Sequence, residues 1–310
     1  MTSPATSIER DLVAAQIGMA AEIAATSPRA VMRRRALTHV GFLIGGVIVL
    51  ATVLIAIFAP LLTSYDPYGQ DLAQRIIPPV WSAKGSWAHL LGTDALGRDY
   101  LTRLMYGARV SLTVGFGAAA IAGLIGTSLG LIGGYFGGRV DAVVMYLVNV
   151  KLALPGILVA LSLIAVFGSS LVIVVTVLGV LFWDRFAVVT RSVTQQIRVS
   201  EYVTAAEAVG ASRTRIILGE ILPNVLNHII VIASLEMAVA ILVEAALSFL
   251  GLGIRPPTPS WGLMVSEGRN FMFFQPYLVA VPGAAIFVLV IAINLLGDGI
   301  RDITAPEGRN

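Results

Sequence analysis

The chain has 310 residues, of which 57% are hydrophobic and 13% are charged, and its mean hydropathy is +0.86. Soluble domains are about half apolar and a quarter charged, so this composition predicts a membrane protein. The chain contains no cysteine, which excludes disulfides, thiolate metal ligands and cysteine nucleophiles. The formal net charge of +3 is too small to favour nucleic acid as a partner.

Long uncharged or nearly uncharged segments recur along the chain. A run of about 18 apolar residues indicates a helix that spans the bilayer. We expect an all-α integral membrane protein with six spans, which are Val40–Leu62, Val110–Tyr135, Val140–Phe167, Leu171–Thr190, Leu226–Leu252 and Tyr277–Leu296. Pro155 should kink the third span, and Asp184 and Arg185 interrupt the inner third of the fourth. Gly115 and Gly117 should let helices approach the second span closely.

Six spans place both termini on one side, and the basic residues indicate which side. Lys and Arg are more numerous in the segments on the side of the termini, which include the cluster Arg33 to Arg35, so we expect both termini in the cytoplasm. The expected division is a cytoplasmic tail, disordered or loosely helical, at residues 1–36; a first span and external loop at 37–109; a core of five spans at 110–300; and a cytoplasmic tail at 301–310. A cytoplasmic loop at about 193–223 interrupts the core.

This loop contains the polar stretch EYVTAAEAVGASRTRIILGEILP, residues 201–223. Ser200 can cap a helix that begins at Glu201, and Gly210 can end it. Ser212 can cap a second short helix, after which Pro223 should turn the chain back toward the membrane.

The first of these helices carries a narrow apolar stripe. Its members recur at helical spacing and are Tyr202, Ala205, Ala206 and Val209. Such a helix suits a groove in another protein, and it equally suits a connector that rests on lipid headgroups.

Several segments resemble the permeases of ABC importers, in the dipeptide/oligopeptide/nickel branch. The spacing of the cytoplasmic EAA loop of that family is matched by Ala205, Ala206, Gly210, Leu222 and Pro223. Further matching segments are LGTDALGRDYLTRLMYGARVSL at 91–112, GGYFGGRVD at 133–141, LPG at 154–156 and EAALSFLGLGIRPPTPSWG at 244–262.

The loop departs from the family pattern at two positions. Thr204 stands in place of the first acid of the EAA triplet, and Glu220 occupies a later Ile position. Glu201 or Glu207 could substitute for the missing acid.

The resemblance implies the transmembrane domain of a type I ABC importer, which imports di- or oligopeptides by alternating access across the bacterial inner membrane. It implies that the loop couples to an ATPase through Glu201, Tyr202, Thr204, Ala205, Ala206, Glu207, Gly210, Leu222 and Pro223. The implied partners are a second homologous permease in a heterodimer, two ATP-binding subunits or domains and an extracytoplasmic solute-binding protein. Alternative solutes are nickel chelates, opines, glutathione and oligosaccharides.

The residues themselves agree that this chain is not an enzyme. It has no glycine-rich loop ending in Gly-Lys-Ser/Thr, so we expect no cofactor here and expect ATP and Mg to be bound by the partner ATPase. An intramembrane enzyme would need a nucleophile and base set that the sequence does not offer. An ion-coupled secondary transporter using Glu236 and Glu244 is a less favoured alternative, because we find no inverted repeat.

Three ionisable residues lie well inside the expected spans, namely Lys151, Glu236 and Glu244. A charged side chain at the bilayer centre costs about 3 kcal/mol, so each needs an explanation. Lys151 and Glu236 lie at similar counts from the inner ends of their spans, so we predict that they pair, either as a structural bridge or along the solute path. Glu244 should brace the fifth span near the outer loop.

Charges also precede the second span. Asp94 with Arg98, and Asp99 with Arg103, have the spacing of ion pairs on a helix. We expect an amphipathic helix here that either shapes a docking face for a solute-binding protein or lies on headgroups. His39, His89 and His228 are too far apart in sequence to indicate a metal site.

Overall fold

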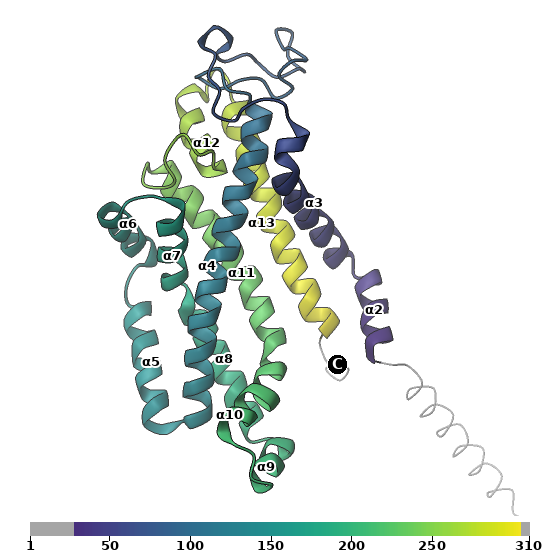
Figure 1. The fold of residues 1–310 in the computed structure, drawn as a ribbon, viewed down its shortest axis with the longest axis vertical. Coiled ribbons are helices and arrows are strands. Elements are labelled where there is room, and N and C mark those ends of the chain that lie inside the picture. Colours follow the sequence, from purple (N-terminus) through teal and green to yellow (C-terminus); the bar gives the residue numbers. More distant parts are fainter. Residues whose placement is uncertain (1–27, 305–310) are drawn as a thin grey trace, which may run out of the picture.

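A bundle of long helices forms the body of the molecule in the computed structural model, which describes residues 28–304 (Figure 1). Most of the two expected tails, residues 1–27 and 305–310, lies outside the described residues. Within the described range all regular elements are helices, accompanied by two isolated β-bridges in the loop before residue 100. The expected all-α class is confirmed.

The helices follow one another along the chain with few long connections. They are α2 (Pro28–Thr38), α3 (Val40–Leu62), η1 (Leu72–Gln74), α4 (Tyr100–Phe136), α5 (Gly138–Leu152), α6 (Gly156–Phe167), α7 (Leu171–Leu181), α8 (Trp183–Arg198), α9 (Glu201–Ala208), α10 (Arg213–Arg215), η2 (Ile216–Ile221), α11 (Leu222–Phe249), α12 (Trp261–Gly268), η3 (Arg269–Phe271) and α13 (Tyr277–Thr304).

Five stretches of the described chain are long and apolar enough to cross a membrane. They are α3, α4, α7 with α8, the run from α10 to α11, and α13. The pair α5 and α6 makes a sixth crossing if it is counted as one broken span, because the two helices meet at an angle of 81°. Pro155, which cannot donate a backbone hydrogen bond, lies in this break, so the expected kink is a break in the helix.

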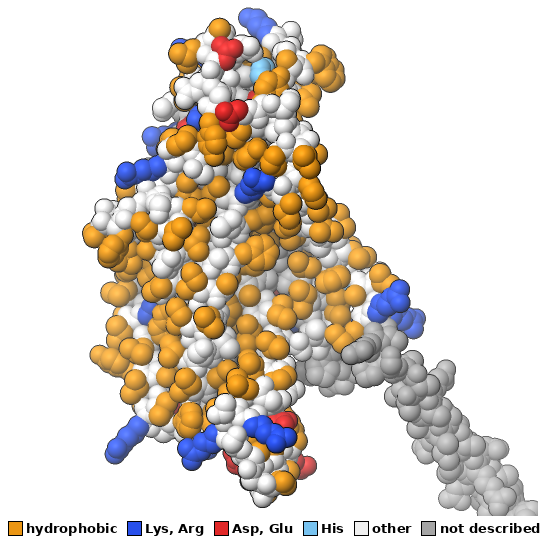
Figure 2. Space-filling model, viewed as in Figure 1, with side chains coloured by type: hydrophobic (Ala, Val, Ile, Leu, Met, Phe, Trp, Pro, Cys, Tyr) orange, Lys and Arg blue, Asp and Glu red, His pale blue; other side chains and the backbone are white. Residues whose placement is uncertain are grey.

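Apolar side chains cover the middle of the face shown in Figure 2, and most of its charged side chains lie toward the two ends. On α3, which matches the expected first span residue for residue, Leu50 and Ile57 are among the exposed apolar side chains. Apolar side chains on the outside of the long helices suit a lipid environment, because the lipid chains that contact them are also apolar.

The long helix α4 lies at the centre of the bundle and packs against α8 along a row of glycines. Gly126, Gly130 and Gly134 recur every four residues, so they share one face of α4. A Cβ atom on Gly130 would lie 2.6 Å from the carbonyl oxygen of Ala187 and 2.9 Å from the amide nitrogen of Arg191. Only glycine permits this approach of the two backbones, which fixes how α8 presents its charged residues.

The close approach expected at Gly115 and Gly117 is confirmed on other faces of α4. A Cβ on Gly115 would meet the Ile241 side chain of α11 at 3.0 Å, and one on Gly117 would meet Val175 of α7 at 2.7 Å.

Candidate functional site

The short helix α9 projects at one end of the bundle, together with α10 (Figure 1). Val203 is fully buried and anchors α9 in an apolar cluster with Tyr135, Ile216 and Val225. The opposite face of α9 is open: Tyr202 and Ala205 are exposed, as is Val209 just after the helix, whereas Ala206 of the predicted stripe is partly buried. Val203 therefore anchors one side of the helix to the bundle, and the other side presents Tyr202 and Ala205 outward.

Both ends of α9 were predicted from capping residues, with different outcomes. Gly210 ends the helix as expected: its φ is +85°, and the Ala211 amide donates to the Ala206 carbonyl at 3.0 Å. The predicted side-chain cap by Ser200 is wrong. Ser200 occupies the cap position, but its hydroxyl donates to the Ile197 carbonyl at 2.5 Å.

The connection from α10 into the next span differs from the prediction. Ser212 caps α10 as expected, accepting from the Arg215 amide at 3.4 Å. Pro223 does not turn the chain, because one continuous helical run extends from Arg213 to Phe249 and passes through a π-helical turn at Ile216–Ile221. The Leu222 amide bonds to the Ile217 carbonyl, five residues back, and this wider turn precedes a proline that has no amide hydrogen to offer.

The acids that could replace the one missing at Thr204 have different surroundings. Thr204 is exposed, and its hydroxyl donates to the Glu201 carbonyl at 2.9 Å. Glu207 accepts a hydrogen bond from the Tyr135 hydroxyl at 3.2 Å, which ties α9 to the end of α4. The Glu201 carboxylate is exposed and bonds to no other described residue, so it is the more available of the two.

A second group of charged residues lies within the spans, and it corrects the predicted pair of Lys151 with Glu236. Lys151 Nζ of α5 bonds to Asp184 Oδ1, and Arg185 Nη1 bonds to Glu236 Oε1 of α11 at 3.0 Å. The predicted direct pair is wrong because α8 provides a partner for each residue: Asp184 and Arg185 are adjacent on its first turn. The sequence did show these two residues inside an apolar span, which was the available signal for their role.

These four residues, which we call the charge quartet, contain two cations and two carboxylates. Asp184 and Glu236 are buried, with 3% and 2% exposure. By contrast, 63% of the Arg185 side chain is exposed. The quartet therefore balances its own charge and still presents one guanidinium at the surface of the chain.

Glu244, the third predicted intramembrane residue, is separate from the quartet. It is fully buried on α11, and its Oε1 accepts a hydrogen bond from the Ser248 hydroxyl at 2.7 Å. Its Oε2 has no hydrogen-bond partner among the described residues. Its expected bracing role remains a prediction.

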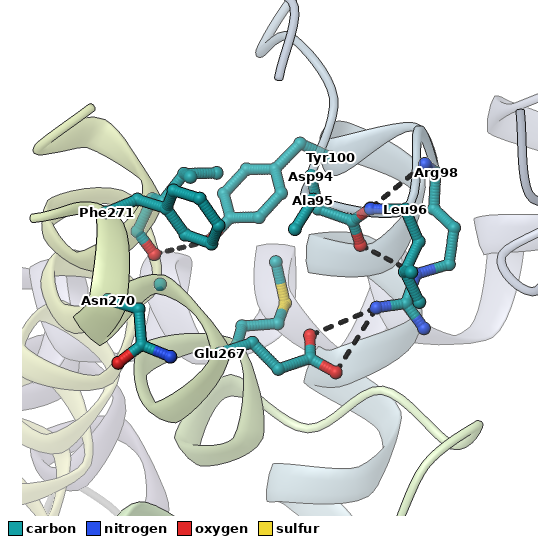
Figure 3. Close-up of a pocket in the computed structure, with 11 residues that line it drawn as sticks. Asp94, Ala95, Leu96, Arg98, Tyr100, Glu267, Asn270 and Phe271 are labelled. Carbon is teal, nitrogen blue, oxygen red and sulfur yellow. Dashed lines mark hydrogen bonds and ion pairs between the residues drawn. The ribbon is translucent and has the colours of Figure 1, made fainter. Parts of the chain in front are cut away.

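At the opposite end of the bundle from α9, charged residues of the loop before α4 meet α12 (Figure 3). Arg98 Nε bonds to Asp94 at 2.7 Å, which confirms that predicted pair, and Arg98 also bonds to Glu267 of α12 at 3.2 Å. Arg103 bonds to both Asp94 and Glu267. A cavity of about 290 Å³ adjoins these residues, and Tyr100 and Phe271 line it too.

The expected helix leading into the second span is confirmed only from Tyr100 onward, which includes Arg103; Asp94 and Arg98 lie in a loop. Asp99 does not pair with Arg103: it caps α4 by accepting from the Thr102 amide at 2.8 Å, and it bonds to His89 at 2.9 Å. Residue spacing could not predict the contact of Arg103 with Glu267, because Glu267 lies 164 positions later in the chain.

Comparisons with known proteins place this geometry in a family. Residues 126–309 match the family described as "Binding-protein-dependent transport system inner membrane component", and residues 27–79 match the "N-terminal TM domain of oligopeptide transport permease C". The structure resembles the MetNI methionine ABC transporter in inward-facing conformations, with a TM-score of 0.52 and 17% identity over 66% of this chain and 97% of that one. That similarity supports the fold.

Similar proteins are known from several bacteria. The dipeptide transport system permease protein DppC of Haemophilus influenzae is 39% identical over 86% of this chain and 90% of its own length. The DppC protein of Alkalihalophilus pseudofirmus is 42% identical over 86% of this chain and 85% of its own length. The glutathione transport system permease protein GsiD of Pectobacterium atrosepticum is 37% identical over 84% of this chain and 85% of its own length. The chain therefore belongs to the family of binding-protein-dependent transport system inner membrane components and is a multi-pass permease subunit of an ABC importer.

Proposed function

We propose that this permease subunit imports peptides of two or a few residues. The observation that carries the proposal is the identity of 39% and 42% to permeases named for dipeptide transport, along most of both chains. The glutathione permease among the relatives favours one second candidate, glutathione itself, which is also a short peptide. Nickel chelates, opines and oligosaccharides have no comparable support among the relatives described above.

The energy for import comes from ATP that a separate subunit or domain binds together with Mg. This chain contains no phosphate-binding loop of the Gly-Lys-Ser/Thr type. The exposed face of α9, with Tyr202, Ala205 and Val209, is where we place the contact with that ATPase. Because Val203 and the bond between Glu207 and Tyr135 tie α9 to α4, a movement of α9 would reach the central helix of the bundle.

The complete importer also contains a second permease subunit and an extracytoplasmic binding protein. A heterodimer of permeases would enclose the route between two bundles, and alternating access would open it to one side at a time. The cytoplasmic side is the one that carries α9, in agreement with the distribution of basic residues.

Reconstitution tests this proposal. The chain is co-expressed with the neighbouring permease, ATPase and binding-protein genes, purified and placed in proteoliposomes. Uptake of a labelled dipeptide should require ATP and the binding protein and should vanish when the ATPase carries an inactivating substitution. Uptake of glutathione with no dipeptide uptake would favour the second candidate, and failure of any ATPase to copurify would contradict the coupling role of α9.

A further inference from the structure

An exposed arginine within a membrane span needs polar surroundings, and the described residues satisfy Arg185 from one side only, through Glu236. Arg185 lies near the middle of the Leu171–Arg198 stretch, and 63% of its side chain is exposed. Direct exposure of arginine to lipid at this depth is costly, and ionisable residues in spans usually face a bundle interior or a water-filled cavity. Water or another polar group therefore lies against Arg185 in the working protein.

The rest of α8 supports an aqueous surrounding. Ser192 and Gln196 are exposed like Arg185, and intervals of seven and four residues place all three on one face of the helix. The other side of α8 buries Thr190 and Thr194, against the glycine row of α4. This face of α8, on which Arg185, Ser192 and Gln196 are joined by the exposed Val188, continues from the charge quartet toward the end that carries α9. We call it the exposed polar face of α8 after its three polar residues.

The guanidinium of Arg185 has unused hydrogen-bonding capacity. An arginine has five N–H donors, and a fork of two of them matches the two oxygens of a carboxylate. Only Nη1 of Arg185 bonds to a described residue, Glu236 at 3.0 Å, so the edge formed by Nε and Nη2 is open. Glu236 is buried and holds the guanidinium in place from one side.

We propose that the exposed polar face of α8 lines the inner half of the solute route and that Arg185 binds the carboxylate of the passing solute. This inference rests on the proposed function, in which the solute is a peptide with a free C-terminal carboxylate. Because the quartet balances its own charge, the carboxylate gains hydrogen bonds without a strong net attraction. Such binding is weak enough for release, as a transport route requires.

Water access to α8 is tested with single cysteines, since the chain has none of its own. Ser192→Cys and, as a control on the apolar surface of α3, Leu50→Cys are assembled into the complete importer in nanodiscs. A membrane-impermeant methanethiosulfonate reagent, which reacts with the thiolate, is followed by the mass of this chain alone. We expect the thiol of the Ser192→Cys variant to react at least about ten-fold faster than that of the Leu50→Cys variant. Equal slow rates, or fast reaction only in the isolated chain, would place α8 against lipid or the second permease and overturn the proposal.

Carboxylate recognition is tested by comparing uptake of a dipeptide with that of its C-terminal amide. The double variant Arg185→Gln with Glu236→Gln removes both charges of the pair, so no buried carboxylate is left without its partner. We expect the acid-to-amide uptake ratio to fall about ten-fold relative to wild type, the value of one good charge-assisted bond, with Arg185→Lys intermediate. The same binding protein serves all variants, so its own preference cancels.

An unchanged ratio in the double variant would overturn the role of Arg185. That outcome is distinct from failure of the proposed function, in which the wild-type importer takes up neither form. The cysteine rates report water access to α8 whichever solute is transported.

Discussion

Replacing Gly210 by valine should uncouple ATP hydrolysis from transport without preventing insertion. Gly210 ends α9 with a φ of +85°, a conformation that residues with a Cβ atom rarely adopt. A Cβ built there meets no atom within 4 Å, so the added Cβ itself causes no steric clash and the backbone strain is the effect that the variant tests. For an L-residue this strain is about 1–2 kcal/mol, and valine lies at the upper end because it is β-branched.

A strain of this size lowers the population of the native end of α9 by a factor of about 5–30. Val203 remains buried in its cluster, so the spans should insert and assemble normally. With the end of α9 displaced, closure of the ATPase is transmitted poorly to α4. We expect the amount of solute imported per ATP hydrolysed to fall several-fold in proteoliposomes.

Two controls separate coupling from strain. Gly210→Asn should be nearly silent, because asparagine tolerates positive φ better than other residues that have a Cβ atom. Gly251→Val is the matched control: its φ is +81°, it also has no atom within 4 Å of an added Cβ, and it follows α11 at the far end of the molecule. Import per ATP at the wild-type level in Gly210→Val, or an equal loss in Gly251→Val, would refute the reasoning.

Two further predictions concern packing and charge within the spans. Gly130→Ala should destabilise the detergent-solubilised chain by about 1–3 kcal/mol, because the added methyl group meets the α8 backbone. Gly283→Ala is the control and should not lower the melting temperature, because a Cβ there has open space around it. Similar melting temperatures for both variants would contradict the proposed role of the glycine row. Lys151→Met leaves the buried Asp184 without its cation and should destabilise the chain by about 3–5 kcal/mol, while adding Asp184→Asn should restore most of the loss. A double variant as unstable as Lys151→Met would show that the pair does not act as a unit.

Much of the fold could be predicted from hydropathy and capping residues. The uncharged block from Val40 to Leu62 gave the bounds of α3, since bilayer length and composition are properties of the segment itself. Gly210 likewise predicts the end of α9, because the positive φ at a helix end depends on the residue at that position and not on distant contacts. The π-helical turn before Pro223 has no such local signal, so from sequence the proline predicts a turn of the chain that the structure does not show.

Contacts between distant segments were harder to predict. Counting residues from the inner ends of two spans predicts that Lys151 lies opposite Glu236. In the structure the span of α5 and α6 is interrupted at Pro155, and α8 supplies Asp184 as the partner of Lys151 and Arg185 as the partner of Glu236. Glu267 joined Arg98 and Arg103 through a contact that no spacing within one segment could indicate. The roles assigned to α9 and the division of the chain into segments remain predictions.

The central claim is that a separate ATPase drives this permease through the exposed face of α9, and Ala205→Arg tests it most directly. Ala205 is exposed and lies on the side of α9 away from Val203, so a large charged side chain there should leave the fold and the pairing of permeases intact. We predict that the variant assembles with the second permease, loses the ATPase on purification and gives no ATP-driven uptake of labelled dipeptide. Full ATPase retention with wild-type uptake would contradict the account.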